Sequence, residues 1–282
     1  MKAFNAPVHF RSVPLLWHRL LAGRGGAVCI PERTGAERTG RQGGSFSLRR
    51  SEPVITDQLK RGVALTLVLT LAAACQQPAM AGESAVATPV AARISSEPKT
   101  LQTAVFAGGC YWGVEGVFSH VNGVTSAVSG FHGGAGGTAQ YDRVSDGDTG
   151  HAEAVRVTYD PAKIRYDQLL RIFFAVVADP TQLNRQGPDS GTQYRSALVP
   201  MNAEQRLVAT AYLAQLRKSG LWKAPIVTRV EAYQRFYPAE VYHQDFMAKN
   251  PRHPYIQAWD VHKVDNLRRL FPSAYRAAFK TG

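Results

Sequence analysis

Cysteine is scarce in this sequence, with three residues among 282. Cys29 lies in a stretch rich in Arg, Gly and Ser, Cys75 follows an alanine-rich run, and Cys110 lies between glycines and aromatic residues. Three such positions form no disulfide framework and have no zinc-ligand spacing, so we predict no bound metal. Each cysteine therefore needs its own explanation, and we assign no role to Cys29.

Acidic residues are also in the minority, with 21 Asp and Glu against 33 Lys and Arg and a formal net charge of +12. A strongly basic chain can bind nucleic acid or an anionic surface. However, residues 1–61 contain 11 Lys and Arg against 4 Asp and Glu, whereas residues 62–282 contain 22 against 17. Because most of the chain is only mildly basic, we predict no nucleic-acid partner.

Long apolar runs are lacking as well, since the run Gly62–Ala74 has thirteen residues where a membrane span needs about 20. The run follows Lys60 and Arg61, a pattern typical of a signal peptide, which we place at 58–81. Residues 1–57 have no sustained periodicity and are interpreted as a disordered leader or a mis-set translation start. Residues 82–100, rich in Ala, Ser, Pro and Val, are interpreted as a linker to a domain at 101–282.

Two processing sites follow the apolar run. Cys75 comes directly after three alanines and resembles the processing site of bacterial lipoproteins, at which the cysteine is lipidated. The alternative is cleavage after Ala79-Met80-Ala81, which would release a soluble protein that begins at Gly82. We predict a location in the bacterial periplasm, or on the periplasmic face of a membrane as a lipoprotein.

From Leu101 onward, apolar residues recur with the period of strands in some segments and of helices in others. Strands are predicted at 103–107, 124–131, 152–159, 193–199 and 226–233, and helices at 111–118, 166–177 and 203–216. Strands and helices do not alternate strictly, which favours an α+β fold. We predict a two-layer sandwich with a mixed sheet and flanking helices, built on a ferredoxin-like core with long loops.

Cys110 is predicted to lie where a strand turns into a helix. Gly108 and Gly109 permit a tight turn, and the helix would direct its first free N–H groups toward the sulfur. A helix N-terminus lowers the pKa of a thiol and stabilises the nucleophilic thiolate. We therefore expect Cys110 to be a nucleophile, the alternative being a small buried core residue.

Four segments between residues 101 and 275 resemble the A-class peptide methionine sulfoxide reductases, in the order and spacing of that family. Gly109-Cys-Tyr-Trp-Gly113 is similar to the family signature Gly-Cys-Phe-Trp-Gly, with Tyr111 in place of Phe. The other three segments are Gly147–Val155, Asp189–Ser196 and Phe236–Gln244. The resemblance implies thiol-dependent reduction of methionine S-sulfoxide, protein-bound and free, to methionine.

The resemblance also implies a division of roles. Cys110 attacks the sulfoxide sulfur, and Glu153 gives a proton to its oxygen, because a carboxyl group in an apolar pocket stays protonated near neutral pH. Tyr141 and Tyr194 correspond to phenols that hydrogen-bond the sulfoxide oxygen, and Asp189 to a supporting carboxylate.

Two aromatic residues next to the cysteine are predicted to bind substrate. Tyr111 and Trp112 would form an apolar slot for the S-methyl group. Ordinary core packing is the alternative for Trp112 and for both phenols.

Regeneration must differ from that of many family members, which carry resolving cysteines near the C-terminus. This chain has none after Cys110, and Cys75 is predicted to be lipidated. The Cys110 sulfenic acid should therefore react with an external thiol, from a thioredoxin-like or glutaredoxin-like protein or a small molecule. We predict no bound cofactor and a monomer whose clients are oxidised exported proteins.

Two other functions use the same residues. A Cys/His acyl-transfer hydrolase would use Cys110 as nucleophile, His151 as base and Asp148 or Asp189 to orient the histidine. An anchored basic binding protein would not need the cysteine at all. If neither holds, we expect His151 and His243 to brace the site.

Overall fold

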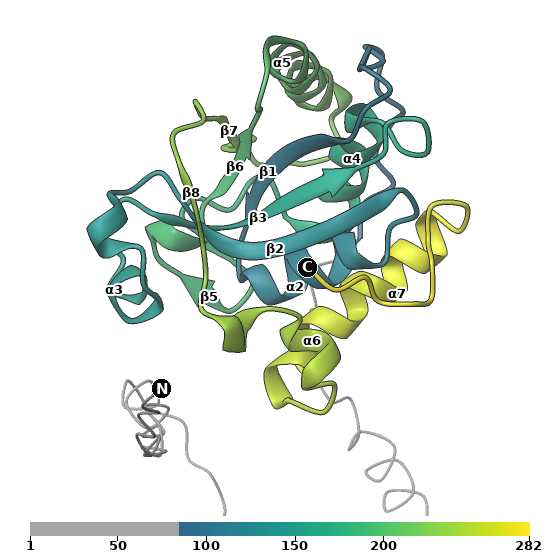
Figure 1. The fold of residues 1–282 in the computed structure, drawn as a ribbon. Coiled ribbons are helices and arrows are strands. Elements are labelled where there is room, and N and C mark those ends of the chain that lie inside the picture. Colours follow the sequence, from purple (N-terminus) through teal and green to yellow (C-terminus); the bar gives the residue numbers. More distant parts are fainter. Residues whose placement is uncertain (1–84) are drawn as a thin grey trace, which may run out of the picture. The chain divides into compact units, whose positions relative to one another are not determined.

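The computed structural model describes residues 85–282, which contain a six-stranded sheet of order β7-β6-β1-β3-β2-β8 (Figure 1). The predictions for residues 1–84, including Cys29, Cys75, the leader and the signal peptide, lie outside the described residues. Within residues 85–282, no helix is both long and apolar enough to cross a membrane.

Four antiparallel strands form the centre of the sheet, in the order β6-β1-β3-β2. The edge strand β7 pairs with β6 in parallel, and β8 pairs with β2 in antiparallel, so the sheet is mixed as predicted. The strands are β1 (Gln102–Gly108), β2 (Val124–His132), β3 (Ala152–Tyr159), β6 (Ser196–Val199), β7 (Arg229–Val230) and β8 (Phe236–Pro238). A separate hairpin joins β4 (Arg185–Gln186) and β5 (Asp189–Ser190).

The helices connect the central strands in the order β1-α2-β2-β3-α4-β6, which is the ferredoxin-like topology. The helices are α2 (Tyr111–Ser119), α3 (Tyr141–Ser145), α4 (Tyr166–Ile172), α5 (Ala203–Ser219), α6 (Phe246–Lys249) and α7 (Val261–Leu270). A π-helical turn, Phe173–Val177, continues α4, and a second one, Ile256–Asp260, leads into α7. The predicted α+β fold with flanking helices is confirmed.

Alternation along the strands decides which side chains face the helices. On β3, Val155 and Val157 belong to the main core, to which α2, α4, α5 and α7 also contribute side chains. Ala152 and Ala154 belong to a smaller cluster on the other face of the sheet. Glu153 lies on the same face of β3 as Val155 and Val157, so its carboxyl group is directed toward α2.

Two predicted strands are shorter than expected. Gln193 and Tyr194 lie in a 3₁₀ turn, Thr192–Tyr194, and the strand β6 begins only at Ser196. The predicted strand 226–233 pairs only as β7, because the N–H of Val227 donates to the carbonyl oxygen of Pro180 in a loop. A local 3₁₀ turn thus shortens the first strand, and a tertiary hydrogen bond outside the sheet shortens the second.

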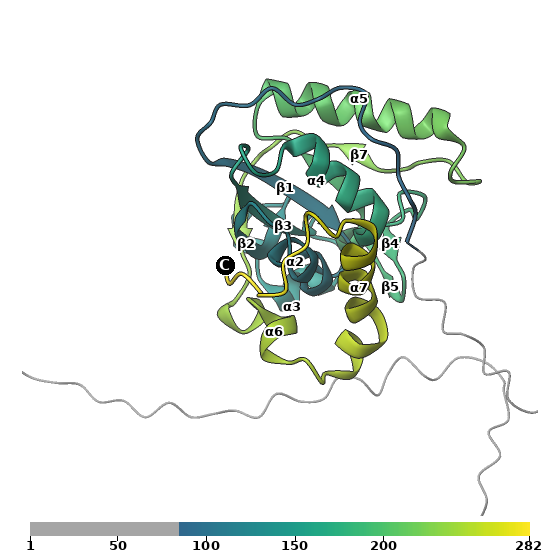
Figure 2. The same ribbon diagram turned by 90° about the vertical axis from the view of Figure 1, so that its right-hand side faces the viewer.

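Residues 85–100 contain no helix or strand but lie against the domain, where Figure 2 shows this segment running past α4 and α5. The N–H of Val86 donates to the carbonyl oxygen of Ala175 at 3.0 Å, and the N–H of Ser95 donates to Oδ1 of Asp167 at 3.0 Å. Ala91 is buried in the main core. This part of the predicted linker is therefore held by both hydrogen bonds and apolar contact.

Glu115 on α2 links stability to pH. Its side chain is buried, and Oε2 accepts a hydrogen bond from the N–H of Asp245 at 2.9 Å. Burial, with the charge of Asp245 added, raises the pKa of Glu115 to about 8, far above its value of about 4.3 in an unfolded chain. The folded state therefore favours the protonated carboxyl group, and the stability this gives is lost as the pH rises through about 8.

We expect Glu115→Gln to weaken the pH dependence of stability. The free energy of unfolding of the unmodified protein should fall between about pH 5 and about pH 8, and the variant should show a smaller fall. Urea titrations at three pH values in this range measure both slopes. Equal slopes in the two proteins would contradict the assignment.

Candidate active site

Cys110 lies at the junction of β1 and α2, as predicted. Gly109 has a φ of +89°, and a Cβ at this position would lie 2.6 Å from Cβ of Gln186, so both conformation and space require glycine. Cys110 is then the N-cap residue of α2. The sulfur atom is thereby held at the N-terminal end of a buried helix.

The thiol of Cys110 is buried, with 8% of the residue exposed. Burial raises its pKa well above the ordinary value, and the negative charges of Glu153, Asp260 and Asp189 raise it further. The backbone N–H of Trp112 acts in the opposite direction, as expected of a helix N-terminus. The prediction of a lowered pKa was wrong because desolvation and nearby carboxylates outweigh this one hydrogen bond, and the resting site holds a neutral thiol.

Glu153 lies next to Cys110 on the helix-facing side of β3. Its Oε2 accepts a hydrogen bond from the N–H of Tyr111 at 3.0 Å, and the residue is 3% exposed. Burial raises the pKa of Glu153 to about 8, Asp189 adds to the rise, and the Tyr111 hydrogen bond opposes it. The carboxyl group is therefore mostly protonated at neutral pH, as expected for an apolar pocket.

The two predicted phenols, Tyr141 and Tyr194, lie within electrostatic reach of Cys110 and Glu153. Tyr141 begins α3, and its N–H donates to Oε1 of Glu240 at 2.9 Å. Tyr194 ends the 3₁₀ turn Thr192–Tyr194. Burial raises the pKa of Tyr141 to about 12 and that of Tyr194 further, and the charges of Glu153 and Cys110 add to both shifts. Both hydroxyl groups are therefore neutral hydrogen-bond donors at physiological pH.

The two aromatic residues after Cys110 differ in exposure. Trp112 is half-buried and stacks on Phe246 with ring centroids 3.7 Å apart, and its Nε1–H donates to Nδ1 of His243 at 3.2 Å. Tyr111 is 1% exposed and packs against Phe131 and His243. Trp112 can therefore contribute a surface to a substrate slot, whereas Tyr111 lies beneath the surface.

Asp189 lies on β5 and contacts a side chain from the C-terminal part of the domain. It accepts a hydrogen bond from the hydroxyl group of Tyr255. Burial raises the pKa of Asp189, while this hydrogen bond and the charge of Lys263 oppose the rise. Tyr255, Lys263 and the buried Asp260 were not predicted. The only sequence pattern that points to this region is the helical spacing of Val264, Leu267 and Leu270, which indicates a helix but not a part of the site.

His151 does not fit the role of base in a hydrolase. Its Nδ1 accepts the N–H of Gly134 at 3.2 Å, and its Nε2 lies 3.0 Å from the carbonyl oxygen of Ala135, to which it donates. Burial lowers the pKa of His151, which keeps the imidazole neutral. Both of its ring nitrogens are then engaged in these two hydrogen bonds, and neither is available as a base. Asp148 is exposed and faces Arg143 at 3.7 Å rather than the histidine. His151 instead braces the glycine-rich loop at residues 133–137, through Gly134 and Ala135.

His243 also serves as a brace. The residue is buried, its ring lies 4.5 Å from that of Tyr141 between centroids, and burial lowers its pKa to about 4. A neutral imidazole here can accept the Trp112 hydrogen bond. The prediction that the two histidines brace the site agrees with these contacts.

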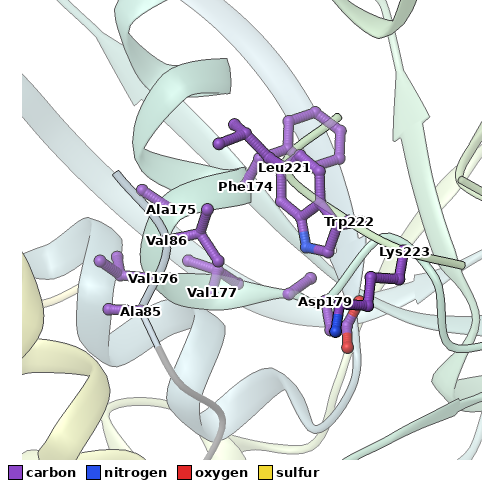
Figure 3. Close-up of a pocket in the computed structure, with 11 residues that line it drawn as sticks. Ala85, Val86, Phe174, Ala175, Val176, Val177, Asp179, Leu221, Trp222 and Lys223 are labelled. Carbon is purple, nitrogen blue, oxygen red and sulfur yellow. The ribbon is translucent and has the colours of Figure 1, made fainter. Parts of the chain in front are cut away.

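A separate pocket lies between the start of the described chain and the π-helical turn Phe173–Val177 (Figure 3). Val86, Phe174 and Trp222 line it, and neither Cys110 nor Glu153 does. Within the described part of the chain, no group of three or more His, Cys, Asp and Glu side chains could hold a metal ion.

Comparison with known proteins agrees with the geometry around Cys110. Residues 102–274 match the family model described as peptide methionine sulfoxide reductase. A peptide methionine sulfoxide reductase MsrA 2 of Mesorhizobium japonicum is 57% identical over 174 residues, which cover 62% of this chain and 89% of that protein. A protein of the same name from Synechocystis is 47% identical over 184 residues, covering 65% of this chain and 86% of that protein.

Among solved structures, methionine sulfoxide reductase A of Corynebacterium diphtheriae is 31% identical, with a TM-score of 0.47, and the match covers 61% of this chain and 89% of that one. The family match includes β1 with Cys110, β3 with Glu153 and the segments that carry both phenols. The chain therefore belongs to the peptide methionine sulfoxide reductase family, and it is an oxidoreductase that reduces peptide methionine S-sulfoxide.

Proposed function

We propose that reduction proceeds through a sulfenic acid on Cys110, with Glu153 moving the protons. The protonated Glu153 gives its proton to the sulfoxide oxygen, which makes the substrate sulfur more electrophilic. The Cys110 sulfur attacks that sulfur, and the new Glu153 carboxylate accepts the thiol proton. Oxygen then passes to Cys110, so that the substrate sulfur gains two electrons and the products are methionine and a cysteine sulfenic acid.

The observation that carries this proposal is the protonated carboxyl group beside the cysteine. Glu153 is fixed by the N–H of the residue that follows Cys110, and its pKa of about 8 keeps a proton available at neutral pH. The neutral phenols of Tyr141 and Tyr194 supply hydrogen bonds to the sulfoxide oxygen as its charge develops. Trp112 offers the apolar face for the S-methyl group, and Asp189 supports the site through Tyr255.

An external thiol completes the cycle in this proposal. One thiol condenses with the sulfenic acid to give a mixed disulfide and water, and a second thiol releases Cys110 and forms the oxidised reductant. Cys110 is the only cysteine in the sequence between residues 85 and 282, which supports an external rather than an internal resolving thiol. A thioredoxin-like or glutaredoxin-like protein, or a small thiol, is the partner, and the enzyme acts as a monomer.

Epimer selectivity tests the proposed function. The purified protein should reduce the S epimer of methionine sulfoxide, free and in a peptide, with dithiothreitol as reductant, and leave the R epimer unchanged. Without reductant, one equivalent of substrate should leave a sulfenic acid that dimedone traps on Cys110, detected by mass spectrometry. No reduction of either epimer would refute the function, and methionine formation without a dimedone adduct would refute the sulfenic acid.

We further propose that this activity repairs oxidised proteins outside the bacterial cytoplasm. The apolar run Gly62–Ala74 after two basic residues and the cysteine that follows it support export and lipidation. Mass spectrometry of the protein from cells distinguishes a diacylglyceryl Cys75 from a free N-terminus at Gly82. An intact N-terminus upstream of residue 58 in a cytoplasmic fraction would contradict export.

A further inference from the structure

A buried ion pair lies behind the first turn of α2. Asp260 ends the π-helical turn Ile256–Asp260 and is 0% exposed, and Lys263 lies in the first turn of α7 and is 8% exposed. The Nζ atom of Lys263 is 3.4 Å from Oδ1 of Asp260. Moving two charges out of water costs free energy, so such a pair is a weak contribution to stability by itself.

Gly113 lets this pair approach the helix that begins at Cys110. A Cβ at position 113 would overlap Oδ1 of Asp260 and would lie 3.2 Å from Nζ of Lys263. Gly113 is the third residue of α2, so the carboxylate of Asp260 faces the first turn of this helix. The N–H groups of a first turn have no acceptor inside the helix and are free to donate elsewhere. A negative charge is favourable at this end of a helix. The same end of the helix carries the reacting sulfur atom.

The two charges of the pair act in opposite directions on the site. Asp260 contributes negative charge that opposes ionisation of Cys110. Lys263 contributes positive charge that favours the ionised form of Asp189, to which Tyr255 is hydrogen-bonded. Because a negative charge opposes formation of a thiolate and a positive charge favours it, the balance between them affects the reactivity of the sulfur atom.

We propose that Asp260 and Lys263 form a positioning pair for the reaction, in which Lys263 offsets the negative charge that Asp260 and Asp189 place beside Cys110. The proposal rests on Cys110 being the reacting group. Charged and titratable groups from several elements act on this site. Those that interact electrostatically with Cys110 are Glu153 on β3, Asp189 on β5, Tyr141 on α3, Tyr194 in its 3₁₀ turn, Tyr111 on α2, Tyr255 and Asp260. Lys263 acts on Asp189 and Asp260.

The pH dependence of Cys110 alkylation tests the pair without requiring sulfoxide reduction. Full-length protein is treated with iodoacetamide between pH 7 and pH 11, and the modified peptide that carries Cys110 is quantified by mass spectrometry. We expect Lys263→Met to shift the midpoint of alkylation upward by about one pH unit and Asp260→Asn to shift it downward by about one. In Lys263→Met, the negative charges of Asp260 and Asp189 would act on the sulfur atom without the opposing charge of the lysine.

Two further variants separate charge from packing. Lys263→Arg keeps the positive charge and should retain the midpoint of the unmodified protein, and the double variant Asp260→Asn/Lys263→Met should lie near it. If the pair had a purely structural role, the midpoint of alkylation would move in the same direction in both single variants or stay unchanged in both. Either result would overturn the proposal. If Lys263→Met does not fold, Asp260→Asn alone tests the proposal. An unchanged midpoint of alkylation in this variant would overturn it.

Discussion

Replacing Cys110 with serine should abolish reduction of methionine S-sulfoxide. A serine hydroxyl group is nearly the same size as a thiol, but it ionises far less readily and its oxygen cannot be oxidised to a counterpart of a sulfenic acid. The loss should appear both in turnover with dithiothreitol and in a single turnover without it. In the latter, the unmodified protein forms up to one methionine per chain and the variant forms none.

Cys29→Ser is the matched control for this experiment, because the chemical change is the same and we assign that cysteine no role. It should retain full turnover. Turnover by Cys110→Ser with either epimer would show that the chemistry does not use this sulfur atom and would also remove the basis for the mechanism involving Glu153.

The central strands and the turn that carries Cys110 followed from local patterns, whereas the place of Glu153 beside the cysteine came from the family resemblance. Strand alternation predicted β1, β2 and β3, and Gly108-Gly109 before an apolar helix predicted the turn that carries the cysteine. The chemistry at the turn was harder to predict. A sequence shows that N–H groups will surround the sulfur, but it does not show how much water is excluded or which carboxylates arrive from other elements. These long-range contributions reversed the direction expected for the pKa of Cys110.

The C-terminal part of the site illustrates the same limit. The apolar spacing of Val264 and Leu267 indicates a helix, yet nothing local shows that Asp260 and Lys263 will lie over Gly113, about 150 residues earlier in the chain. Tyr255 reaches Asp189 by the same packing. Such contacts depend on how α7 and its π-helical turn dock against α2, which is a property of the complete fold.

Replacing Glu153 with glutamine should lower kcat/KM for the S-sulfoxide at pH 7 by about 10²- to 10⁴-fold, the usual contribution of a general acid. The amide oxygen of glutamine can still accept the N–H of Tyr111, so the local structure is retained while the transferable proton is lost. In the unmodified protein, the pKa of about 8 predicts a decrease in kcat/KM as the pH rises through that value, because the carboxyl group loses its proton.

The variant should lack this decrease, which profiles of kcat/KM between pH 6 and pH 9.5 can test. Glu115→Gln is a matched control, because Glu115 is also buried, its pKa is also raised to about 8, and the substitution is the same. This control should keep both the rate at pH 7 and the decrease near pH 8, since Glu115 contacts Asp245 rather than the cysteine turn. If the decrease persisted in Glu153→Gln and disappeared in Glu115→Gln, the proton donor would have been assigned to the wrong carboxyl group.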